Sequence, residues 1–168
     1  LLIAKLIESS EVDAGGKISD FLSIFKNHNN YDISIRNLLL HTSGLPGWRP
    51  FYLITDLRSE ILNLIAAETH DNPIDSHVVY SDLNFLTLGF LLERIHGKGL
   101  DEIMQSEVID ALNLENTSFN PPIELKRMIA ASEKGNEYEK QTCAGTQNKI
   151  RNPHSAFRNQ VIWGEVHD

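Results

Sequence analysis

The triplet Tyr80-Ser81-Asp82 places three side chains that can transfer protons or form hydrogen bonds directly before a strongly apolar segment. A tyrosine held at the start of a well-packed helix can serve as a catalytic phenol, because its oxygen then stays within reach of a partner. Ser81 or Asp82 can accept hydrogen bonds from the free N–H groups of the first helical turn. The alternative is a buried tyrosine beside a helix N-cap, and the triplet taken alone favours that alternative, since short motifs match freely.

A second pair that could carry chemistry is Ser23 and Lys26. Their spacing, Ser-x-x-Lys, places an amine one helical turn from a hydroxyl that it can activate. A pattern with two fixed positions is weak evidence, and this one lies in a short amphipathic stretch that runs into an asparagine-rich loop. We therefore interpret both residues as surface residues of a short helix.

Histidines and acidic residues occur in two loops. His41 could act as a general base, but no second histidine or carboxylate lies nearby at dyad spacing, so we expect its ring to tie its loop to the backbone. The loop 69–76 and its flank carry His70, Asp71, Asp75 and His77. Their spacing does not place two ligands on one helix face, which favours solvated loop residues over a metal site. No metal and no cofactor is predicted.

Hydrophobic periodicity predicts a mainly helical chain. The segment from Leu83 is apolar nearly all round, which is typical of a core helix, and Gly97 is a suitable left-handed residue to end it. Ser34 and Asp56 are the predicted N-caps of two further helices. The predicted helical segments are 1–7, 18–25, 35–41, 57–68, 83–97 and 100–112; the predicted short strands are 116–119 and 161–166; the long irregular segment is 133–159.

Packing faces also follow from this periodicity. The apolar residues predicted to lie on them are Leu1, Ile3, Ala4, Leu6 and Ile7 in the first helix, Ile35, Leu38, Leu39 and Leu40 in the third, Leu57, Ile61, Leu64 and Ile65 in the fourth, and Leu100, Ile103, Met104, Val108, Ala111 and Leu112 in the last.

The composition is that of a soluble globular protein of about one domain, with 168 residues, 41% hydrophobic and 23% charged. A net charge of -8 argues against a nucleic-acid partner or an anionic membrane surface. The single cysteine, Cys143, excludes an intrachain disulfide, and no apolar run approaches the length of a membrane span. The chain starts on an apolar helical pattern without a methionine, which we interpret as a cut chain.

Three segments in order, ISIRNLLLHTSGLPGW, VYSDLNFLTLGFLLERIHGKGLDEIM and LNLENTSFNPP, resemble the serine β-lactamase and penicillin-binding-protein family. The likeness is to its branch of class C β-lactamases, D-alanyl-D-alanine carboxypeptidases and related esterases. The first 22 residues and the terminal WGEVHD are similar to the same branch. The resemblance covers nearly the whole chain apart from roughly 133–159.

The resemblance implies that residues 1–168 form one incomplete domain, the mainly α, helical part of the β-lactamase/transpeptidase-like α+β fold, with one or two short strands. Tyr80-Ser81-Asp82 matches the family's Tyr-x-Asn motif, with Asp82 where asparagine is more usual. Tyr80 and Asp82 are then the catalytic residues; substrate-binding residues stay unknown. Tyr80 relays a proton, and Asp82 orients a lysine or the substrate amide, although a carboxylate cannot donate the hydrogen bond of an asparagine. The nucleophilic serine is expected upstream of Leu1 and a Lys/His-x-Gly strand downstream of Asp168.

Two functions from different classes are open at this point. The first is a fragment of a β-lactamase-related serine hydrolase, acting through an acyl-enzyme on an amide, β-lactam or ester, and inactive alone. Its substrate is a small molecule or peptide, and a face left uncovered is expected to form an apolar patch and to promote self-association. The second is a non-catalytic helical binding or interaction module. The localisation, cell envelope or cytoplasm, is not determined by the sequence.

Overall fold

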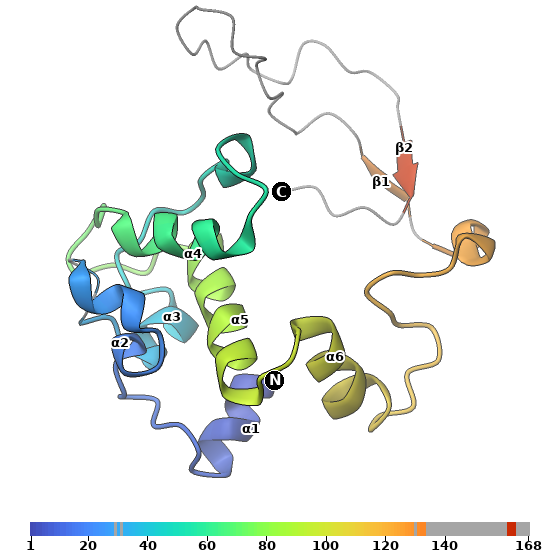
Figure 1. Cartoon of the computed structure of the whole chain (residues 1–168), viewed down its shortest axis with the longest axis horizontal. Coiled ribbons are helices and arrows are strands. Elements are labelled where there is room, and N and C mark those ends of the chain that lie inside the picture. Colours follow the sequence, from blue (N-terminus) through green and yellow to red (C-terminus); the bar gives the residue numbers. More distant parts are fainter. Residues whose placement is uncertain (29, 31, 130, 134–160, 164–168) are drawn as a thin grey trace, which may run out of the picture. The chain divides into compact units, whose positions relative to one another are not determined.

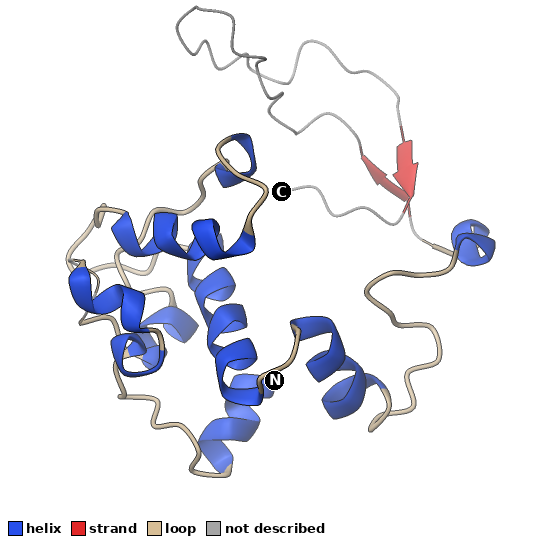
Figure 2. Cartoon of the chain, in the orientation of Figure 1, coloured by secondary structure: helices blue, strands red, loops and turns tan. Residues whose placement is uncertain are grey.

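The computed structural model describes residues 1–28, 30, 32–129, 131–133 and 161–163. The chain divides into two compact units, Leu1–Leu114 and Glu115–Asp168. In the described part of the first unit, all the regular elements are helices (Figure 2). None of the helices in the described ranges has the length and apolar character that a membrane span requires. The prediction of a single domain stays a prediction.

Helix α5 (Asp82–His96) is the element on which the first unit is built (Figure 1). Its buried apolar residues include Leu83, Leu88 and Leu91, and Gly97 ends it with φ 66° in the left-handed region, as predicted. The helices that contact α5 are α1 (Leu2–Glu8), α2 (Ile18–Phe21), α3 (Ile35–Leu40), α4 (Arg58–Ala67) and α6 (Leu100–Met104).

One face of α5 departs from the prediction of a helix buried on most sides. Phe85 and Leu86 are 55% and 45% exposed, whereas the polar residues Asn84 and Thr87 are fully buried. Thr87 is satisfied locally, because its hydroxyl donates to the carbonyl of Leu83 at 2.7 Å. Burial on α5 therefore follows available hydrogen-bond partners as well as hydrophobicity.

Helix caps show one confirmed prediction and one correction. Ser34 caps α3, because its Oγ accepts the N–H of Asn37 at 3.1 Å while the Asn37 side chain accepts the N–H of Ser34 at 3.0 Å. Asp56 is not the N-cap residue of α4. The hydroxyl of Thr55 accepts the N–H of Leu57 at 3.0 Å instead, and Leu57 is the N-cap residue without a side-chain cap bond of its own.

Several helical segments are shorter than predicted, and some of the apolar residues predicted to lie on their packing faces are exposed. The second helical stretch continues from α2 as the 3₁₀ helix η1 (Ser23–Asn27), and α6 continues as the π-helical turn η3 (Gln105–Ile109). A further 3₁₀ helix, η2, spans Phe51–Leu53. The residues predicted to lie on packing faces but found exposed are Leu1, Ala4, Leu40, Leu57, Ala111 and Leu112.

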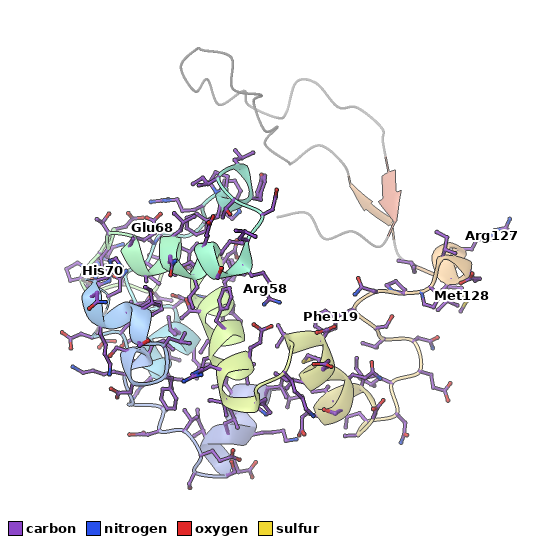
Figure 3. All side chains as sticks on the ribbon, viewed as in Figure 1. Arg58, Glu68, His70, Phe119, Arg127 and Met128 are labelled. Atoms are coloured by element: carbon purple, nitrogen blue, oxygen red, sulfur yellow. The ribbon has the colours of Figure 1, made fainter. Side chains whose placement is uncertain are left out.

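The second unit contains the 3₁₀ helix η4 (Ile123–Arg127) and the strands β1 (Ala131–Glu133) and β2 (Val161–Trp163). The two strands pair antiparallel, with Ser132 opposite Ile162. The predicted strand at 161–166 corresponds to β2, and its last three residues lie outside the described part. The predicted strand at 116–119 is wrong: that stretch forms no strand, and Phe119, which is labelled in Figure 3, is 50% exposed. Cys143 and residues 134–159 are also outside the described part.

Candidate active site

Tyr80 lies two residues before the first residue of α5 and is accessible. Its side chain is 72% exposed, so the alternative of a buried tyrosine is wrong. The ring packs against the imidazole of His41, with centroids 4.8 Å apart and the planes tilted by 42°. The same imidazole stacks on Phe85 at 5.2 Å. The phenol is thus supported on one side and open to solvent.

His41 fixes the backbone on both sides of this tyrosine. It ends α3 in the left-handed conformation, with φ 56°. Its carbonyl accepts the N–H of Val79 at 2.9 Å, and its Nδ1 accepts the N–H of Ser81 at 3.1 Å. The prediction that the His41 ring ties its loop to the backbone is confirmed, and the backbone concerned is that of the triplet.

The Ser81 side chain binds the loop that follows α3 and does not cap the helix that follows it, α5. Its hydroxyl is buried and donates to the carbonyl of Pro46 at 2.6 Å, so it makes no N-cap bond to α5, contrary to the prediction. Next to it, the N–H of Asp82 donates to the carbonyl of Gly47 at 2.8 Å. The loop 41–47 therefore holds all three residues of the triplet region in place.

Asn84 and Ser43 are site residues that the sequence analysis missed. The Ser43 hydroxyl donates to Asn84 Oδ1 at 2.6 Å, and Asn84 Nδ2 lies 3.1 Å from His41 Nδ1. Both side chains are buried, at 1% and 0% exposure. The available signal was an asparagine one turn into an otherwise apolar helix, where it needs partners if it is buried.

Gly44 allows the loop 41–47 to pack closely against the segment after α4. Its φ of 76° is left-handed, and a Cβ added there would lie 2.0 Å from the carbonyl oxygen of Asn72. The N–H of Asp71 donates to the carbonyl of Gly44 at 2.8 Å. Only glycine meets both requirements without moving the backbone.

The acidic and histidine residues considered for a metal site have other partners or surroundings. Asp75 Oδ1 accepts from Asn37 Nδ2 at 2.6 Å and from the Thr42 hydroxyl at 3.0 Å. His70 lies beside Gly44 of the loop 41–47, and partial burial lowers its pKa below the ordinary value. Among the described residues, no three histidine, cysteine, aspartate or glutamate side chains are grouped to hold a metal.

The other predicted residues are placed less distinctively. Asp82 is half-buried at the first position of α5, where a carboxylate is favourable to the helix dipole. Its catalytic role stays a prediction. Ser23 and Lys26 are both exposed on η1. The backbone on both sides of Tyr80 is held by the end of α3 and by the loop 41–47, and the Tyr80 ring packs against His41.

Exposed apolar side chains occur in the same region as the phenol. Val78 is 76% exposed and Val79 38%, and they precede Tyr80 directly, while Phe85 and Leu86 extend along α5. Such a concentration is consistent with a face that another surface or a substrate covers. Self-association through it stays a prediction.

The chain is similar to known proteins over most of its length. A model of the family described as Beta-lactamase matches residues 1–154. A protein of Salmonella typhimurium named as a D-alanyl-D-alanine carboxypeptidase is 27% identical over 183 residues, covering 99% of this chain and 40% of that protein. An N-acetylmuramyl-L-alanine amidase of Bacillus subtilis is 26% identical over 182 residues, covering 99% of this chain and 39% of that protein.

The solved structure of a class C beta-lactamase from Rhodobacter sphaeroides superposes with a TM-score of 0.66 at 19% identity, covering 91% of this chain and 41% of that one. The helix-rich architecture is thus the helical portion of the β-lactamase and penicillin-binding-protein fold. The chain spans about 40% of the length of the curated relatives that it matches.

Proposed function

The chain belongs to the Beta-lactamase family, and from that membership we propose that Tyr80 is the proton-relaying phenol of an acyl-transfer site. The family is one of β-lactamase-like serine hydrolases, and the relatives described above carry the names of a carboxypeptidase and an amidase. For this chain we propose an amide, β-lactam or ester substrate that is processed through an acyl-enzyme.

The observation that carries the proposal is the combination of an exposed phenol with a fixed backbone. Tyr80 is 72% exposed, yet the N–H groups of the residues before and after it both donate to His41. A general acid or base must be held within a few tenths of an ångström of its working position while it stays accessible to substrate. An ordinary surface tyrosine has no need of such support.

In the proposed reaction, a serine hydroxyl attacks the substrate carbonyl and its proton passes to the Tyr80 oxygen. The same proton then goes to the leaving group as the carbonyl–heteroatom bond breaks, which leaves the acyl group on the serine. A tyrosine has an unperturbed pKa of about 10, so this role near neutral pH requires a neighbouring cation. We propose that the nucleophilic serine, and the lysine that supplies this cation, belong to parts of a longer protein outside this 168-residue sequence.

Asp82 has a different proposed role. As a carboxylate it accepts hydrogen bonds and cannot donate them, so it suits the orientation of a lysine amine better than the recognition of a substrate carbonyl. Its position at the start of α5 supports this role, because the preceding backbone is held by the loop 41–47.

The test uses a fluorophosphonate or penicillin probe on two proteins. The 168-residue chain is expected to remain unlabelled, whereas the longest product of the coding sequence that contains it is expected to be labelled at one serine. In that longer product, Tyr80→Phe is expected to lower kcat/KM for an ester substrate by about 10²- to 10⁴-fold. Tyr52→Phe, at a tyrosine whose ring lies near Trp48, is the matched control and is expected to change little.

Labelling of the 168-residue chain at Ser23 would overturn the proposal, as would full activity of Tyr80→Phe. A longer product that neither reacts with the probes nor turns over an ester would favour the non-catalytic module instead.

A further inference from the structure

We infer that His41 is the positioning residue for Tyr80, and that Asn84 and Ser43 hold its imidazole as the neutral tautomer with the proton on Nε2. The assignment of Tyr80 as the working phenol rests on the proposed function. The position of its backbone and ring, and the tautomer of His41, do not depend on that function.

The first step concerns the backbone around Tyr80. One residue, His41, accepts the N–H of Val79 with its carbonyl and the N–H of Ser81 with its ring, at 2.9 and 3.1 Å. The Tyr80 side chain between them rests on the same ring, at 4.8 Å between centroids. Three separate contacts from one residue therefore fix both the main chain and the side chain of the phenol.

The second step concerns the conformation of His41. A φ of 56° is left-handed, and in a residue with a Cβ this costs on the order of 1 kcal/mol. Such a conformation persists where the surrounding contacts hold it in place. Here those contacts are the ones to the residues that flank Tyr80 and to Asn84. The strained residue and the phenol thus belong to one arrangement.

The third step fixes the tautomer. The N–H of Ser81 can only donate, so His41 Nδ1 must be an acceptor and the ring proton of the neutral imidazole is on Nε2. Asn84 then presents its amide N–H₂ to Nδ1, which turns its Oδ1 toward the Ser43 hydroxyl. The oxygen of that hydroxyl accepts the N–H of Leu45 at 3.1 Å, so its own hydrogen is directed to Asn84.

The chain of hydrogen bonds therefore has a backbone N–H at each end, that of Leu45 and that of Ser81. These two fixed donors determine which atom donates and which accepts in each hydrogen bond between them. Asn84 and Ser43 are almost completely removed from water. At such sites an unpaired polar atom is costly, which makes an alternative orientation of the network unfavourable. Because Asn84 lies on α5, the core helix sets the position of the imidazole and, through it, of Tyr80.

The first experiment reads the tautomer directly on the 168-residue chain. Long-range ¹H–¹⁵N spectra of ¹⁵N-histidine-labelled protein are expected to show His41 with a pyridine-like Nδ1 and a protonated Nε2. Asn84→Asp is expected to change this pattern, because a carboxylate oxygen beside Nδ1 requires a proton there and displaces the N–H of Ser81. A wild-type His41 with its proton on Nδ1 would overturn the inference.

A matched control separates this effect from general destabilisation. Asn30 is equally buried, but its amide donates to the carbonyls of Ile65, Ala66 and Glu68 around the end of α4. Asn30→Asp is expected to lower the melting temperature while leaving the ring signals of His41 and Tyr80 unchanged. If both variants moved the Tyr80 signals alike, the role of Asn84 would be merely structural.

The second experiment uses two substitutions of His41 in the longest product of the coding sequence. Asparagine carries an acceptor oxygen that can replace Nδ1 and adopts the left-handed conformation more readily than most residues, whereas alanine lacks the acceptor. His41→Ala is expected to lower kcat by about 10- to 100-fold with a smaller change in KM, because a misplaced phenol affects the chemical step. His41→Asn is expected to recover part of that loss.

Failure of this inference is distinguishable from failure of the proposed function. If Tyr80→Phe abolishes activity while His41→Ala and His41→Asn are both as active as wild type, the positioning role is wrong and the phenol stands. If Tyr80→Phe has no effect but the Tyr80 signals shift in the His41 variants of the 168-residue chain, the proposed function is wrong and the positioning contact stands.

Discussion

Two short motifs in this chain have residues suited to catalysis, and the structure supports them very differently. Ser23 and Lys26 lie exposed on the 3₁₀ helix η1. Tyr80 is just as accessible, but its neighbours are fixed by His41 and Ser81 is anchored to Pro46. The difference teaches that spacing identifies residues that could react, whereas residues distant in sequence determine which of them are held ready to do so.

The largest loss of stability is expected from a substitution that displaces the loop 41–47, which holds the triplet. Gly44→Ala places a Cβ in a left-handed residue and against the carbonyl of Asn72, at 2.0 Å before relaxation. The two costs together should lower the free energy of unfolding by about 2–4 kcal/mol. Urea denaturation followed by circular dichroism measures this change, and the ring contact of Tyr80 should weaken with it.

Gly97→Ala is the matched control for this substitution. Gly97 has a similar φ of 66°, but no atom lies within 4 Å of the added Cβ. Only the conformational cost remains, so we expect a loss of about 1 kcal/mol and no change at Tyr80. Equal losses in both variants would mean that the close approach to Asn72 does not support the site.

A smaller effect is expected from the two serines themselves. Ser81→Ala removes the hydrogen bond to the buried carbonyl of Pro46, which should cost about 1–3 kcal/mol in unfolding free energy. Ser23→Ala alters an exposed side chain and should stay within about 0.5 kcal/mol. Thermal unfolding of the two variants under one condition gives the comparison. A larger loss for Ser23→Ala would reverse the contrast drawn between the motifs.

Much of the helical framework could be predicted because its signals are local. The periodicity of α5, the left-handed glycine after it and the capping of α3 by Ser34 all depend on residues within a few positions of one another. Where the prediction of a cap was wrong, at Asp56, the helix begins one residue later, with Leu57 as the N-cap, and the N–H of Leu57 donates to Thr55. Local patterns do not decide between two adjacent side chains that can both accept.

The site itself was only partly predictable, because its contacts join residues about 40 positions apart. The triplet drew attention to Tyr80, yet nothing near it in sequence shows that His41 supplies both hydrogen bonds to its neighbours. Asn84 was hidden within an apolar helix, and its function as a link appears only when Ser43 and His41 are brought against it. The same distance explains why the Ser81 hydroxyl was assigned to the wrong partner.

The smallest expected effect is a pH dependence of the unfolding free energy that arises from His70. Burial lowers the pKa of His70 in the folded state, so below about pH 6.5 the unfolded chain binds more protons at this residue than the folded one. Stability should therefore fall as the pH decreases from about 7.5 through 6.5, and level off below the folded pKa. His70 lies beside Gly44 of the loop 41–47, because a Cβ added to Gly44 would be 3.5 Å from the Cβ of His70. Urea unfolding at several pH values gives the slope of the unfolding free energy against pH, which should be shallower in His70→Gln than in wild type. The control is His77→Gln, at an exposed histidine, which should keep the wild-type slope. An unchanged slope in His70→Gln would show that this histidine titrates alike in both states.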